Sequence, residues 1–325
     1  MYVANRPIAE TVEQTRITAS GNEQSDNRGE KDRTFQGDFR VLSRQDNQDE
    51  YIASVMWVNA RERPCVRRYA APVTTPLLLL GGSWPDEPGL DTALSQLILD
   101  RVSQGAMPAT MRLYVPGREV AFGKRDTVAP QYPAAVAAAH EAGFNAVERL
   151  AGGRAAVFTE ETVAFSLAVP DTDPRSTIYD RFRLISNLMI DAFARLGVAS
   201  AVGELPGEYC PGEFSVHHDH RVKLMGVGQR LAKNAAHVGG VVAVNRSDLL
   251  LQALIPVYRA LDLEWRPSTA GTLGGVRPGI TNDDVIAALR AEIGKHFIVS
   301  KDRIDGETVQ LARLNAAHHV PKPRS

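Results

Sequence analysis

The stretch Gly207–Arg230, GEYCPGEFSVHHDHRVKLMGVGQR, brings a cysteine, three histidines and a lysine close together in the chain. Lys223 lies between a valine and a leucine, an alternation typical of a strand whose apolar residues point to one face and whose lysine points to the other. We therefore expect a strand over residues 222–231, with residues 238–244 as its antiparallel partner. Lys223 is either a functional group on the open face of a sheet or an ordinary solvated lysine.

Outward from this stretch, strand and helix patterns follow one another without a regular parallel order. A run of leucines at Leu77–Leu80 predicts a buried strand, and Met111–Val115 with Glu119–Gly123 predicts a β-hairpin around a Pro-Gly turn. Apolar spacings of three and four predict a long helix over Arg175–Leu196, and Glu307–Leu314 is expected to be a short strand. This order indicates an α+β fold with a mostly antiparallel sheet flanked by helices.

Composition divides the chain into three segments. Residues 1–75 are rich in charged and amide side chains with few clustered apolar residues, so we expect a disordered extension and linker. The folded body is expected over residues 76–263. Residues 264–325 begin in a Gly/Pro/Thr-rich loop and are expected to form a small C-terminal accessory element.

The overall charge and cysteine content exclude several classes of protein. The 325 residues have a net charge of −1, which gives no reason to expect a nucleic-acid or membrane-surface partner. The two cysteines form no disulfide framework, which suits a reducing cytoplasm. No apolar run approaches the roughly 20 residues of a membrane-spanning helix. We expect a soluble, cytoplasmic protein.

A second group of chemically informative residues is Arg149–Arg154, RLAGGR. Two glycines, Gly152 and Gly153, would let backbone amides approach an anion, and the two arginines would supply charge and forked donors. The alternative is a plain turn between strands with solvated arginines. Neither a phosphate-binding P-loop nor a dinucleotide fingerprint fits the residues that follow.

Two other features of the opening stretch allow alternative interpretations. Cys210 is either an acyl-accepting nucleophile, with a base or a positive charge nearby, or a small core residue. The run His217–His220 suggests a metal site, but consecutive loop residues rarely converge on one ion without a distant ligand. We therefore expect a polar turn and no metal site.

Taken together, these residues resemble the lipoate–protein ligase, octanoyltransferase and biotin–protein ligase superfamily, and most of all proteins like lipoate–protein ligase A. The family motif R-R-S-G-G-G-A-V is similar to RLAGGRAAV at 149–157, and its lysine strand G-R-K-x-x-G-x-A-Q-R is similar to HRVKLMGVGQR at 220–230. A weaker match is EVAFGKRD at 119–126. The resemblance covers residues 77–263 in the expected order.

The resemblance implies the catalytic domain of a class II synthetase-like biotin/lipoate ligase over residues 76–263. Its implied activity is to activate lipoate or octanoate with ATP and Mg²⁺ and to transfer the acyl group to a lysine of a lipoyl domain. Lys223 would contact the carboxylate oxygen and the α-phosphate. The implied anion loop consists of Arg149, Gly152, Gly153 and Arg154, and Gly226 would keep the strand open against the ligand.

The sequence also departs from the family pattern, which leaves two alternatives open. The second arginine of the first motif is Leu150, its third glycine is Arg154, and the usual histidine is replaced by Phe158. Certain octanoyltransferases carry an acylated cysteine ahead of the lysine, so Cys210 could accept octanoate from an acyl carrier protein, with Lys223 polarising the carbonyl. The altered first motif also allows a non-catalytic protein that binds lipoyl, biotinyl or acyl groups.

Overall fold

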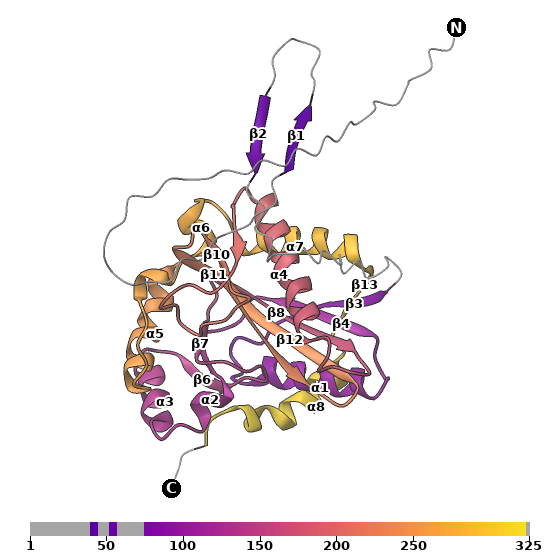
Figure 1. Cartoon of the computed structure of the whole chain (residues 1–325). Helices are drawn as coiled ribbons and strands as arrows, with labels where there is room; N and C mark the ends of the chain where they lie inside the picture. Colours follow the sequence, from indigo (N-terminus) through magenta and orange to yellow (C-terminus); the bar gives the residue numbers. More distant parts are fainter. Residues whose placement is uncertain (1–39, 45–51, 57–74, 323–325) are drawn as a thin grey trace, which may run out of the picture. The chain divides into compact units, whose positions relative to one another are not determined.

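The computed structural model describes residues 40–44, 52–56 and 75–322 (Figure 1). The chain divides into two units, Met1–Arg68 and Tyr69–Ser325. In the first unit, β1 (Arg40–Arg44) pairs antiparallel with β2 (Ile52–Met56). The rest of the predicted disordered extension, apart from its last residue, lies outside the described residues, so that expectation stays a prediction.

The second unit contains an eight-stranded sheet in the order β13-β3-β4-β8-β12-β11-β10-β9. The pairs β13/β3 and β3/β4 are parallel and the other five are antiparallel, so the predicted mostly antiparallel α+β fold is confirmed. The predicted pairing of the lysine strand with the strand after it is also confirmed, as β11 with β12. The strands are β3 (Pro76–Gly81), β4 (Ala109–Tyr114), β8 (Thr162–Pro170), β9 (Ala201–Val202), β10 (Val216–His218), β11 (Val222–Leu231), β12 (Ala235–Ala243) and β13 (Ile298–Arg303).

A smaller sheet has the order β6-β5-β7, formed by β6 (Asn145–Glu148), β5 (Glu119–Phe122) and β7 (Ala156–Phe158). The predicted hairpin of β4 and β5 is therefore wrong. β4 pairs with β3 and β8 in the large sheet, whereas β5 pairs with β6 and β7 in the small one. The Pro-Gly segment between them carries the chain from one sheet to the other, with Gly117 packed against the backbone of Pro85.

Eight α-helices and two short 3-10 helices complete the described part of the second unit. Residues 307–314, predicted as a strand, lie in α8, whose first turn is capped by the Asp305 side chain, which accepts a hydrogen bond from the Thr308 N–H. The helices are α1 (Leu90–Ser103), α2 (Lys124–Thr127), α3 (Tyr132–Glu141), α4 (Ile178–Arg195), α5 (Ser247–Ala260), α6 (Leu273–Val276), α7 (Asn282–His296), α8 (Gly306–Ala316), η1 (Pro267–Thr269) and η2 (Ala317–His319).

The largest apolar core lies between one face of the large sheet and helices α4 and α7 (Figure 1). α4 contributes a stripe that includes Ile185, Leu188, Met189 and Phe193, all buried. Burying each such side chain contributes roughly 1.5 to 3 kcal/mol. A second core joins the small sheet to α3 and α5. Ala243 of β12 also belongs to this second core, and the loop that leaves β6 reaches the large sheet through the hydrogen bond from the Gly152 N–H to the Gln229 O.

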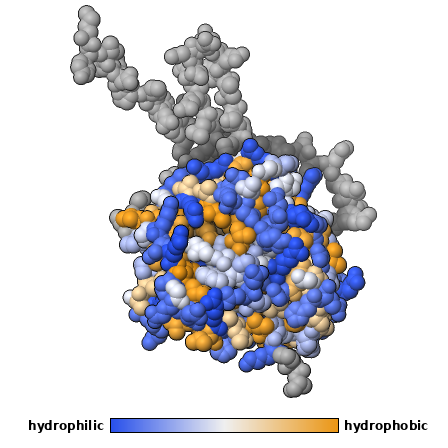
Figure 2. All heavy atoms as spheres, turned by 180° about the vertical axis from the view of Figure 1, so that it is seen from behind, coloured by the Kyte–Doolittle hydropathy of each residue, from blue (hydrophilic) through white to orange (hydrophobic). Residues whose placement is uncertain are grey.

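The exposed surface is mixed. On the face drawn in Figure 2, hydrophilic residues are interspersed with small apolar areas. Large exposed apolar side chains come from separate elements, for example Val128, Tyr179 and Leu314. In the described ranges, no helix combines the length and the hydropathy needed to span a bilayer.

Candidate active site

Cys210 belongs to the stretch Gly207–Arg230, and its thiol lies against the loop that follows β6. Two donors converge on Sγ: the Arg149 Nη2 and the Arg154 backbone N, each at 3.3 Å. Cys210 has a positive φ of 42°, an uncommon conformation for a residue other than glycine. The thiol is thus held against a guanidinium and a backbone N–H, the surroundings that stabilise a thiolate.

The charge around Cys210 outweighs the effect of its burial. Burial raises the pKa of the Cys210 thiol. The charges of Arg149 and Lys223, together with the hydrogen bonds from the Arg154 N–H and from Arg149, lower it by more than burial raises it, so the net pKa lies below the ordinary thiol value. A lowered pKa increases the thiolate fraction near neutral pH. Among the described residues Cys210 is a free cysteine, so its sulfur is available for chemistry.

Lys223 is buried, with 1% of its surface exposed, and does not project into solvent. Its Nζ donates to the Tyr209 O at 3.1 Å and to the Cys210 O at 2.8 Å, and it lies 3.5 Å from the Glu208 Oε2. The interpretation as an ordinary solvated lysine is therefore wrong. Lys223 fixes the backbone that carries the thiol and places a positive charge beside it.

Glu208 is the counter-ion of that lysine and also orders the loop after Cys210. Its Oε1 accepts from the Gly212 N–H at 2.9 Å and from the Ser215 Oγ at 2.8 Å. Burial raises the pKa of Glu208, and Lys223 and the two donors oppose that rise. A buried ion pair of this kind holds its geometry firmly, because breaking it would leave an uncompensated charge.

Tyr258 of α5 connects the cysteine loop to the strand after the Gly-Gly loop. The Cys210 N–H donates to the Tyr258 Oη at 2.7 Å, and that hydroxyl donates to the Ala155 O at 3.0 Å. Since both groups are on irregular backbone, this hydroxyl satisfies two polar groups that the sheets leave unpaired. No sequence pattern indicated this role, because Tyr258 lies among apolar residues on the buried face of a helix.

The Gly-Gly loop touches both the thiol and the large sheet. Gly152 N–H donates to the Gln229 O of β11 at 3.3 Å, which ties the loop to the sheet. Gly153 has a φ of +105°, and a Cβ there would lie 2.8 Å from the Cys210 Sγ. Position 153 therefore requires glycine for two reasons: its backbone conformation, and the closeness of the sulfur to the place of a Cβ.

The two arginines of this loop have different partners. Arg149 Nη2 donates to the Arg154 O at 2.7 Å as well as to the thiol. The Arg154 guanidinium instead pairs with the buried Asp126, at 3.2 Å. Arg149 is thus the guanidinium that contacts the sulfur, whereas Arg154 contributes its backbone N–H. Asp126 ends the EVAFGKRD match at 119–126, and that pattern carries no signal of its pairing with the loop.

Gly226 lies beneath the lysine. A Cβ there would be 3.1 Å from the Lys223 Cε, so the space above this glycine is taken by the lysine side chain. Farther along β11, a Cβ on Gly228 would lie 3.0 Å from the Ala151 Cβ. The glycines of β11 therefore make room for the lysine and for the Gly-Gly loop. The expectation that Gly226 leaves space for a ligand stays a prediction.

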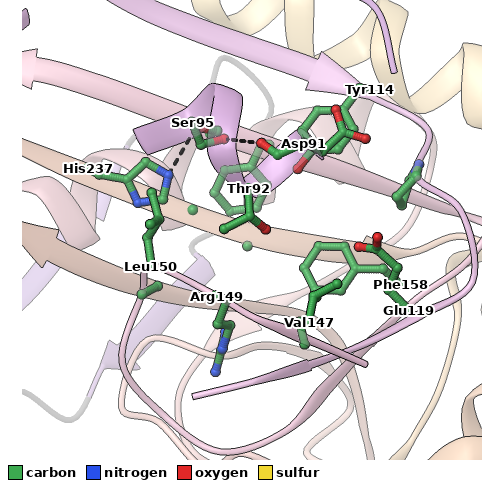
Figure 3. Close-up of a pocket in the computed structure, with 17 residues that line it drawn as sticks. Asp91, Thr92, Ser95, Tyr114, Glu119, Val147, Arg149, Leu150, Phe158 and His237 are labelled. Carbon is green, nitrogen blue, oxygen red and sulfur yellow. Dashed lines mark hydrogen bonds between the residues drawn. The ribbon is translucent and has the colours of Figure 1, made fainter. Parts of the chain in front are cut away.

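Behind the loop lies a cavity with about 540 Å³ of empty space, part of it open to solvent (Figure 3). Arg149 lines it and its Nη2 also contacts the Cys210 thiol, whereas Cys210 itself is not among the lining residues. Its walls come from α1, the small sheet, the loop, and strands β8 and β12 of the large sheet. The lining residues are Asp91, Thr92, Ser95, Tyr114, Pro116, Glu119, Ala121, Val147, Arg149, Leu150, Ala151, Phe158, Phe165, Ser166, His237, Gly239 and Gly240.

Several of the lining side chains are polar. Asp91 is paired with the buried Arg112 at 2.5 Å, and Ser166 Oγ lies 2.9 Å from the His237 Nε2. Burial and the charge of Asp91 raise the pKa of Glu119 to about 7, despite a hydrogen bond from the Gly89 N–H. None of these residues was identified as a site residue from the sequence, because they are distributed over five separate elements and only Glu119 lies in a motif match.

The histidine run has two parts. His217 and His218 are in strand β10, and Asp219 with His220 forms the turn to β11, with φ of 53° and 52°. Positive φ at both central residues is typical of a tight hairpin turn. The predicted polar turn is therefore confirmed at Asp219 and His220 and wrong at His217 and His218, which lie in a strand, with His217 buried. Within residues 75–322, no group of three or more His, Cys, Asp or Glu side chains is arranged to hold a metal ion.

The structure thus brings together five of the residues expected from the sequence, Arg149, Gly153, Arg154, Cys210 and Lys223. Arg149 and Cys210 are 61 residues apart in the chain. The cations of this group are already engaged, by the thiol, the Asp126 carboxylate and backbone carbonyls. The arrangement suits a charged sulfur nucleophile with a cavity behind it.

A family model described as the lipoyl protein ligase A/B catalytic domain matches residues 87–292. Among similar curated proteins, the octanoyl-[GcvH]:protein N-octanoyltransferase of Anoxybacillus flavithermus is 29% identical over 155 residues, 48% of this chain and 55% of that protein. The lipoyl-[GcvH]:protein N-lipoyltransferase of Listeria monocytogenes is 27% identical over 130 residues, 40% of this chain and 46% of that protein. The chain spans about half the length of these relatives.

Solved structures share the fold. A chain from the bipartite lipoate protein ligase and E2 lipoyl domain of Thermoplasma acidophilum aligns with a TM-score of 0.57 at 19% identity, covering 75% of this chain and 92% of that one. Lipoate-protein ligase A bound with ATP aligns with a TM-score of 0.56 at 18% identity, covering 75% and 94%. At these identities the likeness concerns the fold alone.

Proposed function

Because the chain belongs to the lipoyl protein ligase A/B catalytic-domain family, we propose that it transfers an octanoyl or lipoyl group to a protein lysine through a thioester on Cys210. The observation that carries this proposal is the pair of donors at 3.3 Å from the Cys210 Sγ. The names of the similar curated proteins, which are acyltransferases acting between proteins, support the same class of reaction.

In the first step of the proposed reaction, the Cys210 thiolate attacks the carbonyl carbon of an acyl group on a donor protein. A sulfur–carbon bond forms, the bond from that carbon to the donor's nitrogen or sulfur breaks, and the leaving group takes up a proton. In the second step, the amine of an acceptor lysine attacks the thioester, loses a proton and releases the thiolate. Neither step needs a nucleotide. An acyl group on the donor's sulfur is already activated as a thioester, and an acyl group on the donor's nitrogen is moved from one amide to another.

The residues around the sulfur supply the electrostatics of both steps. Arg149 and the Arg154 N–H stabilise the thiolate before attack, and they remain close to the oxyanion that develops on the carbon bonded to Sγ. Lys223 holds the carbonyls of Tyr209 and Cys210 and adds positive charge near the sulfur. In this proposal it positions the nucleophile, rather than contacting the substrate carboxylate as the resemblance implied.

The ATP-dependent ligase stays a prediction, and the same experiment tests it. In a ligase, ATP and Mg²⁺ would supply the energy that activates a free carboxylic acid. Arg149 and Arg154 are the residues that would face the phosphates. Both are engaged with protein groups, Arg154 with Asp126 and Arg149 with the Arg154 O and the thiol, so the residues present do not offer a ready anion site.

The test is intact-mass analysis of the full chain incubated, without ATP, with an octanoylated carrier protein, either a GcvH-type protein or acyl carrier protein. We expect an octanoyl adduct on the chain, lost in Cys210→Ala and retained in Cys65→Ala, the matched control for the second cysteine. Adding an apo lipoyl domain should move the adduct to that domain. Modification only from free octanoate with ATP and Mg²⁺ would overturn the transferase in favour of the ligase, and no modification under either condition would indicate a non-catalytic binder.

A further inference from the structure

A groove lies beside the segment that carries the thiol, at the end of α5 and the loop that follows it. It has about 920 Å³ of empty space, part of it open to solvent. Its lining combines three large apolar side chains with three charged ones. The lining, called the α5 groove, consists of Gly207, Ile255, Arg259, Leu263, Glu264, Trp265 and Arg266.

The side chains of the α5 groove are accessible to a partner. Ile255 is 38% exposed, and Arg259 and Arg266 are exposed as well. Leu263 and Trp265 are half-buried. Tryptophan and arginine are enriched among the few residues that supply most of the binding free energy in protein–protein interfaces. The composition of the groove therefore favours a protein as its ligand.

The two arginines of the groove carry charge that the protein does not neutralise. Within residues 40–44, 52–56 and 75–322, neither Arg259 nor Arg266 forms an ion pair. The lining contains a single carboxylate, that of Glu264, so two positive charges stand against one negative charge. Ile255 and Arg259 are four residues apart on α5 and lie on the same face of the helix. A complementary ligand has an apolar side chain with carboxylates beside it.

The α5 groove is attached to the segment that carries the thiol. The Arg266 N–H donates to the Gly207 O at 2.7 Å. A Cβ on Gly207 would lie 2.8 Å from the Arg266 Cγ, so the aliphatic part of the Arg266 side chain lies against this segment. Gly207 precedes Cys210 by three residues, a length of chain that spans at most about 11 Å.

Trp265 connects the groove to the residues that hold the sulfur. The centroid of its ring system lies 5.9 Å from that of the Tyr209 ring and 5.4 Å from that of the Tyr258 ring. The Tyr258 Oη accepts a hydrogen bond from the Cys210 N–H. The Tyr209 O accepts a hydrogen bond from the Lys223 Nζ. The groove is thus built on side chains that also position the thiol, so a partner bound there has a defined position relative to it.

The size of an ordinary interface relates the groove to the reaction. A stable protein–protein interface covers about 800 Å² of each partner, an area with a radius of roughly 16 Å. Because Gly207 lies within about 11 Å of Cys210, an interface that covers the half-buried Cys210 can also extend over the exposed Gly207 and the groove.

We propose that the α5 groove docks the protein that donates the acyl group to Cys210, and that it binds an apolar side chain flanked by carboxylates on that protein. The arginines attract the carboxylates, and Trp265 with its apolar neighbours receives the apolar side chain. This inference rests on the proposed function, since it takes the acyl donor to be a protein.

Surface plasmon resonance tests the groove without turnover. It compares the binding of an octanoylated GcvH-type protein to the Cys210→Ala chain and to the groove variant, which is the same chain with Arg259→Glu and Arg266→Glu. We expect association to be roughly tenfold slower in the groove variant at an ionic strength of about 0.02 M, with a smaller difference at about 0.5 M, where salt screens exposed charges. Equal association rates in the two chains, or no binding by either, would overturn the proposal.

The matched control reverses two charges elsewhere on the protein. Lys301 and Arg303 are exposed on β13, five strands from β11 in the large sheet and thus roughly 24 Å from it. Lys301→Glu with Arg303→Glu makes the same change in net charge and should leave association unchanged. An equal slowing in this control would indicate a general effect of charge and contradict docking at the groove.

A small thioester separates docking from damage to the thiol. With Cys210 present, octanoyl-N-acetylcysteamine should acylate the thiol at the wild-type rate in a chain with Arg259→Glu and Arg266→Glu, because this donor does not use the groove. If its rate falls as much as the rate with the octanoylated protein, the substitutions act on the thiol and the proposal is wrong.

Hydrogen exchange in the unaltered groove covers the case in which the groove variant does not fold. Binding of the octanoylated GcvH-type protein to the Cys210→Ala chain should slow amide exchange in peptides that contain residues 262–266, and not in peptides from β13. Equal exchange at 262–266 with and without the partner contradicts the proposal. A dimer of the chain alone that dissociates on Arg259→Glu and Arg266→Glu would assign the groove to a second copy and overturn it as well.

The outcomes distinguish this inference from the proposed function. Binding that depends on Arg259 and Arg266, without any adduct on Cys210, would refute the proposed function alone. An adduct that forms from the octanoylated protein at the same rate with and without Arg259→Glu and Arg266→Glu would refute this inference alone.

Discussion

Replacing Arg149 by glutamine removes the positive charge nearest the Cys210 thiol and leaves a shorter, neutral amide side chain. The Arg149 Nη2 lies 3.3 Å from Sγ. At that separation the Coulomb energy between a guanidinium and a thiolate is about 1 kcal/mol with the dielectric constant of water and about 5 kcal/mol at an effective dielectric constant of 20. Since 1.36 kcal/mol corresponds to one pKa unit, the titration midpoint of Cys210 in Arg149→Gln should be at least about one pH unit higher.

The direction follows from the opposing influences on the thiol. Burial raises the pKa of Cys210, and the charges of Arg149 and Lys223 together with two hydrogen bonds lower it below the ordinary value. Removing Arg149 leaves burial less opposed, so the thiolate forms at higher pH. The midpoint is measured from the ultraviolet absorbance of the thiolate, with Cys210→Ser as the baseline and the second cysteine replaced by alanine.

Arg154→Gln is the matched control, because its guanidinium pairs with Asp126 and its contact with the sulfur is through the backbone N–H, which the substitution keeps. The midpoint in this variant should stay close to that of the wild type. An unchanged midpoint in Arg149→Gln, or a larger change in Arg154→Gln than in Arg149→Gln, would refute the electrostatic account of the thiol.

Three further substitutions test other parts of the account. Tyr258→Phe removes the hydroxyl between the Cys210 N–H and the Ala155 O. Because a buried N–H then lacks its partner, the free energy of unfolding measured in urea should fall by about 1 to 3 kcal/mol. An unchanged free energy of unfolding would contradict the bridging role. Gly153→Ala requires a Cβ 2.8 Å from Sγ at a φ of +105°, so Cys210 should be acylated more slowly in time-resolved intact-mass analysis, whereas Gly294→Ala, in open space on α7, should acylate at the wild-type rate. The pKa of His237 is about 4 in the fold against an ordinary 6.5, so the unfolded chain binds more protons between these values and stability is lost as the pH falls through this window. From pH 7 to pH 5 the wild type should lose about 2 kcal/mol more than His237→Leu in the same urea assay, and parallel losses in the two proteins would refute the neutral buried histidine.

The parts of the fold that the sequence predicted are those with a long, local pattern. The strand containing Lys223, its partner after the turn and the amphipathic helix α4 all formed as expected, because their periodicity extends over many residues. The hairpin expected around Pro116-Gly117 failed because a turn signal does not say to which sheet each flanking strand belongs. The strand predicted for residues 307–314 was wrong because a short apolar alternation fits a strand as well as a helix.

The site shows the same division. The motifs identified Arg149, Gly153, Cys210 and Lys223 as candidates, and the family match places them in one catalytic domain. Spacing in the chain could not reveal that Arg149 contacts the sulfur directly, or that the lysine points to backbone carbonyls. Those facts depend on how the loop after β6 crosses β11.

Residues that act through the tertiary structure had no sequence signal at all. Tyr258 lies in an apolar helix face, Glu208 is one acidic residue among many, and His237 begins no motif. Each becomes recognisable through a contact: a hydroxyl between two loops, a carboxylate against a buried ammonium, and a ring nitrogen beside the Ser166 hydroxyl. Such contacts join segments far apart in the chain and therefore require the folded structure.

The most direct test of the central claim is the mass of the proteolytic peptide that contains Cys210 after incubation of the chain with an octanoylated carrier protein in the absence of ATP. The account predicts an octanoyl group on that peptide, removed by neutral hydroxylamine as expected for a thioester, and absent from the peptide that contains Cys65. An unmodified Cys210 peptide from a chain that nevertheless octanoylates a lipoyl domain would contradict it.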